Sequence, residues 1–254
     1  MTNLEKLREN FFKNGFIIVR KMFSKTKIKT FVNELHNVKI KSTNAKNKHI
    51  HFTYDNRVNS IHGINNYINS GTIADLAKNK KLLNIVSSIL GSKPLIRNIE
   101  LFLKPKKTGL RVPFHQDNYY WKIKNKKAVN VWIACAESNR KNGVISYYLK
   151  SHKNGLYKHV LTGEPGSSQK IPDKYLKKIK LKKIYPRLKS GDCIVHHCET
   201  VHGSDFNKSN KDRAALVISY KSKEAIIDRE KIKQYKKLVK KNLQLLKQKR
   251  KYED

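Results

Sequence analysis

Acidic residues are scarce in this sequence, and cysteines are few. The 254 residues contain 19 Asp and Glu against 56 Lys and Arg, which gives a formal net charge of +37. Cys135, Cys193 and Cys198 are an odd number and show no CxxC spacing. The sequence therefore indicates neither a disulfide framework nor a structural zinc site, and we expect the three cysteines to be buried as small apolar side chains.

Long apolar runs are also missing. No segment approaches the roughly 20 apolar residues that cross a bilayer, and the first residues lack the charged, apolar and small-residue segments of a secretory signal. We expect no membrane span and a cytoplasmic location.

The excess of positive charge raises the question of a nucleic-acid partner. Lysine supplies most of it and is spread along the chain, as in KIKNKKAV (122–129) and KYLKKIKLKKIYPRLK (174–189). A dedicated nucleic-acid surface more often concentrates arginine and stacking aromatics. We interpret the charge as a solvated surface, and binding of a polyanion or of an anionic substrate stays open as an alternative.

The spacing of apolar residues changes along the chain. Residues 4–14, 24–38 and 72–90 have helical spacing, and Gly15 and Gly91 are expected to end the first and third helices. From residue 95 onward the pattern alternates, with short predicted strands at 95–104, 112–121, 128–135, 143–149, 191–202 and 214–220. This order predicts an α+β fold, in which N-terminal helices pack on one sheet of a jelly roll.

Two further segments are set apart from this pattern. Residues 153–187 form a long connection of the kind that often serves as a lid or binding loop. Residues 222–254 form a Lys-rich helical tail that we expect to dock on the domain or on a second subunit, through an apolar stripe of Ile232, Tyr235, Val239, Leu243 and Leu246. We therefore divide the chain into a domain at 1–221 and a tail at 222–254.

The segment VPFHQDNYYW (112–121) contains the first candidate site residues. On a strand, His115 and Asp117 would project from the same face, because side chains two residues apart share a face. His202 ends a later apolar run, and the polar segment after it is predicted to be a hairpin turn that places Arg213 directly across from His202. Two histidines and one carboxylate suit non-haem Fe(II), and a guanidinium nearby suits a dicarboxylic acid.

These residues lie in blocks that resemble the phytanoyl-CoA dioxygenase family of Fe(II)- and 2-oxoglutarate-dependent oxygenases. The resemblance runs from about residue 6 to residue 220 and is carried by LRENFFKNGFIIVRKMFS, PFHQD, RKNGVISYYLKSHKNG, KSGDCIVHHCETVHGS and the strand of Arg213. It implies a double-stranded β-helix (jelly-roll, cupin-like) core, followed here by a C-terminal helix.

The resemblance also implies roles for individual residues. His115, Asp117 and His202 would bind iron, and Arg213 would hold the distal carboxylate of 2-oxoglutarate with help from Ser204. Trp132 would lie against the co-substrate, and Lys104 would supply a further contact. The family also tends to carry a histidine at the position of His197, which we interpret as a hydrogen-bonded residue beside the metal ligands or as a packing residue.

The expected activity is hydroxylation of a C–H bond in a small molecule, with O₂ as co-substrate and decarboxylation of 2-oxoglutarate to succinate. Halogenating members of this scaffold lack the carboxylate ligand, so the presence of Asp117 favours hydroxylation. Arg111, Tyr119, Tyr120 and Lys158 are candidate contacts for an anionic group of the substrate. Two alternatives remain open: a polyanion- or nucleic-acid-binding jelly roll without oxygenase activity, and a catalytically silent relative.

Overall fold

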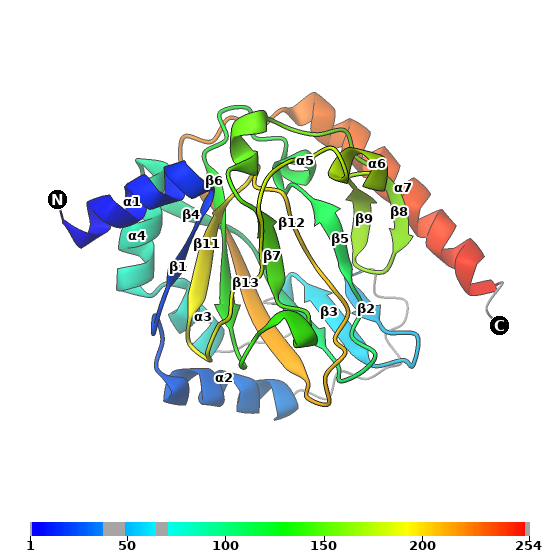
Figure 1. Cartoon of the computed structure of the whole chain (residues 1–254), viewed down its shortest axis with the longest axis horizontal. Coiled ribbons are helices and arrows are strands. Elements are labelled where there is room, and N and C mark those ends of the chain that lie inside the picture. Colours follow the sequence, from blue (N-terminus) through cyan, green and yellow to red (C-terminus); the bar gives the residue numbers. More distant parts are fainter. Residues whose placement is uncertain (1, 38–48, 65–70, 252–254) are drawn as a thin grey trace.

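Two antiparallel sheets face each other in the protein, and helices cover the outer face of the larger sheet (Figure 1). The computed structural model describes residues 2–37, 49–64 and 71–251. At residue 242 and at residues 245–251 it describes the backbone only. The larger sheet has the order β1 (Phe16–Val19), β11 (Cys193–His197), β6 (Ala128–Ala134), β13 (Arg213–Ser222), β4 (Pro94–Lys104), β3 (Val58–His62) and β2 (Ile50–Phe52).

The smaller sheet lies opposite and has four strands. Their order is β10 (Lys183–Ile184), β7 (Ile145–Tyr148), β12 (His202–Ser204) and β5 (Val112–His115). A separate hairpin of β8 (Val160–Glu164) and β9 (Ser167–Lys170) lies within the long connection, followed by the short helix α6 (Asp173–Leu176). Short helical turns α5 (Asn118–Trp121), η3 (Arg140–Asn142) and η4 (Ser151–Asn154) complete the loops. The predicted α+β jelly-roll fold is confirmed.

The N-terminal helices follow the predicted spacing closely. Helix α1 (Asn3–Asn14) begins with a capping box between Thr2 and Glu5 and ends at Gly15, whose φ of 87° is a left-handed conformation that favours glycine. Helix α2 (Lys25–Asn37) begins after Ser24, whose hydroxyl accepts a hydrogen bond from the Lys27 amide.

The predicted helix at 72–90 is two helices in the structure. Helix α3 (Gly71–Ala77) ends before Asn79, and α4 (Lys80–Leu90) begins after it. The Asn79 side chain accepts a hydrogen bond from the Leu82 amide, and this cap starts a new helix in place of continuing the old one. The prediction of a single helix was wrong, because an internal capping residue interrupts the apolar pattern.

The two larger apolar clusters result from the alternation of side chains along the strands. One core lies between the helices and the outer face of the larger sheet, with Phe11, Phe31, Leu82, Val131 and Leu216 among its fully buried members. The other lies between the two sheets and includes Trp132, Ile145 and Tyr147. Cys135, Cys193 and Cys198 are free and buried, as predicted.

The C-terminal helix α7 (Arg229–Lys251) packs on the hairpin of β8 and β9 and on α5 (Figure 1). Docking on the domain is therefore confirmed for part of the predicted apolar stripe, including Tyr235, whereas the side chain of Leu246 lies outside the described residues. Within residues 2–37, 49–64 and 71–251, no helix has both the length and the apolar character needed to span a bilayer.

Candidate metal and co-substrate site

His115 and His202 come from neighbouring strands of the smaller sheet. His115 is the last residue of β5 and His202 the first of β12, and the two residues are directly paired across the strands. Each ring uses Nδ1 for a hydrogen bond to a backbone carbonyl at 2.8 Å, His115 to Pro113 and His202 to Thr200. Nδ1 therefore carries the hydrogen in both rings, which leaves both Nε2 atoms as acceptors that can bind a metal ion.

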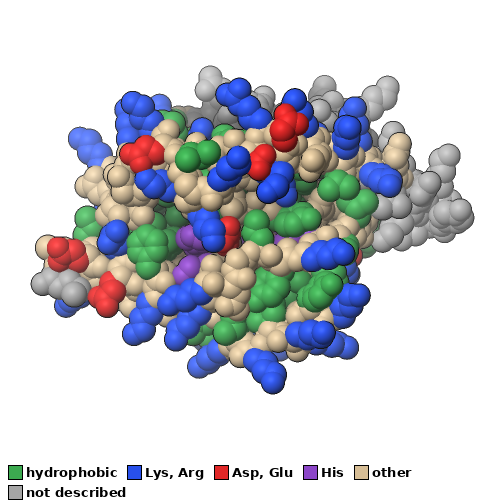
Figure 2. All heavy atoms as spheres, turned by 90° about the horizontal axis from the view of Figure 1, so that it is seen from above, with side chains coloured by type: hydrophobic (Ala, Val, Ile, Leu, Met, Phe, Trp, Pro, Cys, Tyr) green, Lys and Arg blue, Asp and Glu red, His purple; other side chains and the backbone are tan. Residues whose placement is uncertain are grey.

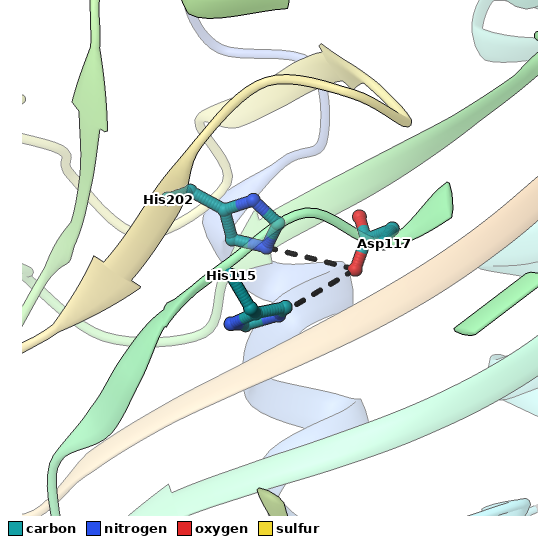
Figure 3. Close-up of side chains that lie close together, drawn as sticks. All are labelled: His115, Asp117 and His202. Atoms are coloured by element: carbon teal, nitrogen blue, oxygen red, sulfur yellow. Dashed lines mark ion pairs between the residues drawn. The ribbon is translucent and has the colours of Figure 1, made fainter. Parts of the chain in front are cut away.

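Asp117 completes the cluster, although it does not lie on the predicted strand. Strand β5 ends at His115, and Asp117 occupies the cap position of α5 with helical backbone angles. Its Oδ1 lies 3.6 Å from Nε2 of His115 and 3.6 Å from Nε2 of His202, and Figure 3 shows the three side chains pointing toward one another. One potential ligand atom from each residue lies within 4.8 Å of the others, and all three residues are buried.

The second oxygen of Asp117 is held by two buried side chains. Asn130 donates from Nδ2 to Oδ2 at 2.8 Å, and Nε2 of His196 lies 3.1 Å from the same oxygen. Nδ1 of His196 lies 2.9 Å from the Tyr147 hydroxyl. Burial raises the pKa of Asp117, but His202 and the hydrogen bonds of His115 and His196 outweigh it and hold this pKa well below its ordinary value.

The supporting histidine is thus His196 and not His197. Residues 196 and 197 are consecutive on β11 and point to opposite faces of the sheet. His197 packs beside Phe11 and His152, away from Asp117. The interpretation of His197 as a packing residue is confirmed, whereas its alternative, a hydrogen bond beside the metal ligands, is made by His196 on the opposite face of the strand.

A pair of buried cations lies at one end of the cavity. Arg213 begins β13 and is directly paired with Lys104, the last residue of β4. Lys104 donates from Nζ to the Ser204 hydroxyl at 2.7 Å, and the Trp132 ring lies 5.4 Å from the guanidinium of Arg213. Arg213 donates from Nη2 to the Gly143 carbonyl oxygen.

Neither of these two cations forms an ion pair within the part of the chain that the structure describes. Nε and Nη1 of Arg213 are buried without a hydrogen-bond partner, and no carboxylate of the described residues forms an ion pair with Arg213 or Lys104. Burial, together with the neighbouring Arg213, lowers the pKa of Lys104 well below its ordinary value. An anion bound here would satisfy the orphaned donors and compensate both charges.

Arg213 reaches the cavity by a different route from the one predicted. Strand β12, which carries His202, pairs with β5 and β7, whereas β13, which carries Arg213, pairs with β4 and β6. His202 and Arg213 therefore lie on opposite sheets, and the predicted hairpin pairing was wrong. The two sheets nevertheless enclose one cavity lined by all seven predicted residues, namely Lys104, His115, Asp117, Trp132, His202, Ser204 and Arg213.

A second cavity continues from the metal cluster toward α7. His115 and Asp117 line it together with Arg97, Glu100, Tyr120 and Tyr235. Of the candidate substrate contacts predicted from the sequence, only Tyr120 lines it. Arg111 forms an ion pair with Glu164 at 2.7 Å, and Tyr119 stacks on His159.

The comparisons with known proteins agree with this geometry. The family model described as phytanoyl-CoA dioxygenase (PhyH) matches residues 11–215. A phytanoyl-CoA dioxygenase of Arabidopsis thaliana is 29% identical over 142 residues, which cover 56% of this chain and 49% of the relative. A probable alpha-ketoglutarate-dependent hypophosphite dioxygenase of Stutzerimonas stutzeri is 29% identical over 157 residues, covering 60% and 54%. The chain spans about half the length of these curated relatives.

Solved structures share the fold. EctD from S. alaskensis with bound Fe superposes with a TM-score of 0.73 at 20% identity, covering 90% of this chain and 79% of that one. The non-heme alpha ketoglutarate dependent carbocyclase SnoK from nogalamycin biosynthesis superposes with a TM-score of 0.71 at 16% identity, covering 89% and 86%. With its family match over residues 11–215, the chain belongs to the phytanoyl-CoA dioxygenase family.

Proposed function

We propose that this chain is a non-haem Fe(II)- and 2-oxoglutarate-dependent dioxygenase that hydroxylates a C–H bond of a small molecule. His115, Asp117 and His202 would hold the iron, and Arg213, Ser204, Trp132 and Lys104 would hold the 2-oxoglutarate. The observation that carries the proposal is a buried cluster of two histidines and one aspartate beside an unpaired buried guanidinium.

The donor set suits ferrous iron. Two imidazole nitrogens and one carboxylate on one face leave open positions on the metal for a co-substrate and O₂, and bound iron with 2-oxoglutarate supplies the activation of O₂. The backbone carbonyls of Pro113 and Thr200 fix the tautomers of His115 and His202, so the ligand atoms are already oriented.

The remaining residues would position the oxoacid and exclude water. The guanidinium of Arg213 can form two parallel hydrogen bonds to a carboxylate, and the ammonium of Lys104 adds a second positive charge. Phe102, Ile145 and Val217 line the same cavity with apolar surface. This lining keeps the local dielectric low, so the charges act more strongly on the bound anion than they would in water.

The test is anaerobic addition of Fe(II) and 2-oxoglutarate to the protein, followed by absorbance spectroscopy. We expect the weak visible charge-transfer band of a chelate between Fe(II) and 2-oxoglutarate. Asp117→Ala should abolish the band. Arg213→Gln should raise the 2-oxoglutarate concentration for half-saturation at least about tenfold, because a charge-assisted pair is lost.

Arg187→Gln is the matched control, since Arg187 is 81% exposed in its side chain and lies outside the cavity. It should leave the band and its half-saturation unchanged. A full-strength band in both Asp117→Ala and Arg213→Gln would show that the site is misplaced.

Several finer expectations from the sequence remain predictions. They are a cytoplasmic location, the division into a domain at 1–221 and a tail at 222–254, and an oligomer formed through the C-terminal helix. The relatives named above support a small-molecule substrate, since they include a probable hypophosphite dioxygenase. Binding of a polyanion is the competing proposal, and it requires no metal cluster.

A further inference from the structure

The cavity that runs from the metal cluster toward α7 has a volume of about 230 Å³. His115 and Asp117 form its inner end, and Tyr120, Trp121, Ser168 and Tyr235 belong to its walls. The Tyr235 hydroxyl and the Ser168 hydroxyl are 2.9 Å apart, so α7 is fixed to the hairpin across this cavity. A compact molecule bound here would place its C–H bonds next to the candidate iron site.

Strand β4 contributes lining residues both to this second cavity and to the first cavity, which would hold the oxoacid. Glu100, Phe102 and Lys104 alternate along the strand and all line the first cavity, whereas the adjacent residues Ile99 and Leu101 are in the core beneath the helices. Lys104 lies at the end with Arg213, and Glu100 also lines the second cavity. One strand therefore presents a cation to the co-substrate side and a carboxylate to the other side.

A β-bulge in β4 brings a second charged group to the same cavity. Ser219 of β13 is paired with Asn98 and Tyr220 with Ile96, so Arg97 is the extra residue of the bulge. Because of this extra residue, the side chains of Arg97 and Asn98 project from the same face of the sheet, and both line the second cavity. Regular alternation would instead have turned the Arg97 side chain toward the helices.

Arg97 is available to bind an anion. Its guanidinium lies over the Trp121 ring at 4.8 Å from the centroid, and within the described part of the chain it forms no hydrogen bond or ion pair. A stacked guanidinium keeps its edge free for hydrogen bonds in the ring plane, which is the geometry that binds a carboxylate or another oxyanion.

Glu100 is available to accept a hydrogen bond. Its Oε1 lies 2.7 Å from Nδ1 of His62 and accepts from Nδ2 of Asn98 at 2.8 Å, which fixes the carboxylate. Among the described residues no hydrogen bond reaches Oε2. Because His62 and Asn98 occupy only one oxygen, the other can accept from an N–H group of a bound molecule.

We propose that the substrate is a compact zwitterion, whose anionic group binds Arg97 and whose protonated amine donates to Glu100. This proposal rests on the proposed function, because it takes the cluster of His115, Asp117 and His202 as the oxidising centre. It identifies Arg97 and Glu100 as specificity-determining residues and Tyr235 of α7 as part of the pocket wall. Residues 229–251 lie beyond the region matched by the family model, so this wall is not part of that match.

Three six-membered-ring probes test the charges separately. Pipecolate carries both groups, cyclohexanecarboxylate only the anion and piperidine only the ammonium. Binding of each to the full-length protein with Fe(II) and 2-oxoglutarate is measured anaerobically by isothermal titration calorimetry. We expect pipecolate to bind at least about tenfold more tightly than either single-charge probe, because each charge-assisted hydrogen bond contributes that much.

Two variants test which residue binds each charged group of the probes. Arg97→Gln should weaken pipecolate and cyclohexanecarboxylate about tenfold and leave piperidine unchanged, whereas Glu100→Gln should weaken pipecolate and piperidine and leave cyclohexanecarboxylate unchanged. Arg140→Gln is the matched control, because Arg140 is also exposed and stacked on an aromatic ring, 4.7 Å from Tyr185, but lies outside the cavity. Thermal unfolding of each variant confirms that it is folded.

Equal affinity for the three probes, absence of binding by all three, or equal effects of Arg97→Gln and Arg140→Gln would overturn the proposal. The charge-transfer band of the same preparations separates this result from a failure of the proposed function. A normal band in Arg97→Gln and Glu100→Gln shows that the metal and oxoacid sites are intact. If the band is absent from the unmodified protein, the oxygenase assignment fails, while the calorimetry still reports whether the cavity selects zwitterions.

Discussion

The two oxygens of the Asp117 carboxylate have different partners. One faces the two histidines of the cluster, while the other is held by Asn130 and His196. Removing such support typically weakens metal binding ten- to a hundredfold. We therefore expect His196→Leu to weaken Mn(II) binding by about this factor, measured by metal titration with electron paramagnetic resonance.

The neighbouring histidine provides the control for that experiment. His197→Leu changes the same residue type at the next position of β11, on the face turned away from Asp117. Its affinity for Mn(II) should equal that of the unmodified protein. An equal loss in both variants would indicate a general disturbance of β11 and not the support of Asp117.

Asp192 shows how a buried carboxylate joins β1 to the turn before β11. Its oxygens accept hydrogen bonds from the amides of Lys21 and Lys189 and from the Arg20 guanidinium, at 2.8 to 2.9 Å. Burial raises the pKa of Asp192, but these donors outweigh it, so the folded pKa lies below the ordinary value. The stability that Asp192 contributes is therefore present above the unfolded pKa and is lost as pH falls through the folded pKa.

We expect Asp192→Asn to lower the free energy of unfolding by about 2 kcal/mol at neutral pH. The difference from the unmodified protein should shrink as pH falls below about 4, because the unfolded chain binds a proton at Asp192 there, and it should vanish once the pH is below the lowered pKa of the folded state. Urea unfolding at several pH values measures this. A constant difference across the range would contradict the assignment.

Single residues could be predicted from the sequence where a motif identifies them. His115, Asp117 and His202 do come together, as does Arg213 beside Lys104. Arg97 and Glu100 could not be predicted, because the bulge that turns Arg97 toward the cavity depends on pairing with β13 and leaves no local signal in the sequence. Asn130 is likewise one polar residue in an otherwise apolar strand, a weak signal that could have indicated a contact with the site.

At the scale of elements, α7 and the β8–β9 hairpin stabilise each other. Tyr235 lies 5.7 Å from the Tyr120 ring and contacts Ser168 of β9. We expect Tyr235→Ala to increase amide hydrogen exchange in residues 160–170, because the hairpin loses the side chain that fixes it to α7. Exchange in β4 and β13 should not change, since both lie within the larger sheet.

Leu238→Ala is the comparison for this variant. Leu238 is on the same helix and is 38% exposed, so its removal should leave exchange in the hairpin unchanged. If both variants give the unmodified exchange pattern, α7 does not stabilise the hairpin.

Helices and strands were predicted well where the spacing of apolar residues continued without interruption over the whole segment. The strand at 95–104 and the helix at 4–14 agree with β4 and α1 within a residue. The segment 112–121 was predicted as one strand because its side chains are β-branched and aromatic, but only its first four residues are β5 and its last four form α5. Which strand follows which in a sheet is set by contacts far apart in sequence, and this is why the pairing of His202 was predicted wrongly.

At the scale of the whole molecule, the large excess of lysine and arginine makes the positive charges repel one another. Figure 2 shows Lys and Arg side chains spread over one face and not gathered in a single patch, with histidine side chains between them. A net charge of +37 opposes the compact state through self-repulsion. This distribution agrees with the interpretation of a solvated surface.

Salt should therefore stabilise the protein. Raising NaCl from about 20 mM to about 300 mM shortens the screening length from about 20 Å to about 6 Å, which weakens repulsion between distant lysines. We expect the midpoint of thermal unfolding to rise by about 3 °C or more, measured by calorimetry. Sucrose at matched osmolality is the control for a non-ionic effect, and a midpoint that falls with NaCl would contradict this prediction.

The alternation of cavity-facing and core-facing side chains along β4 restricts how this sequence can evolve. Inserting or deleting one residue between Glu100 and Lys104 would reverse the face of every residue on one side of the change, so Glu100 and Lys104 would no longer point to the same face of the sheet. The same slip would turn part of the apolar layer beneath the helices toward the cavities and would remove one of the two charged residues from them. Folding and chemistry thus depend on one strand's length, so we expect variation in length to accumulate in the loops on either side of β4.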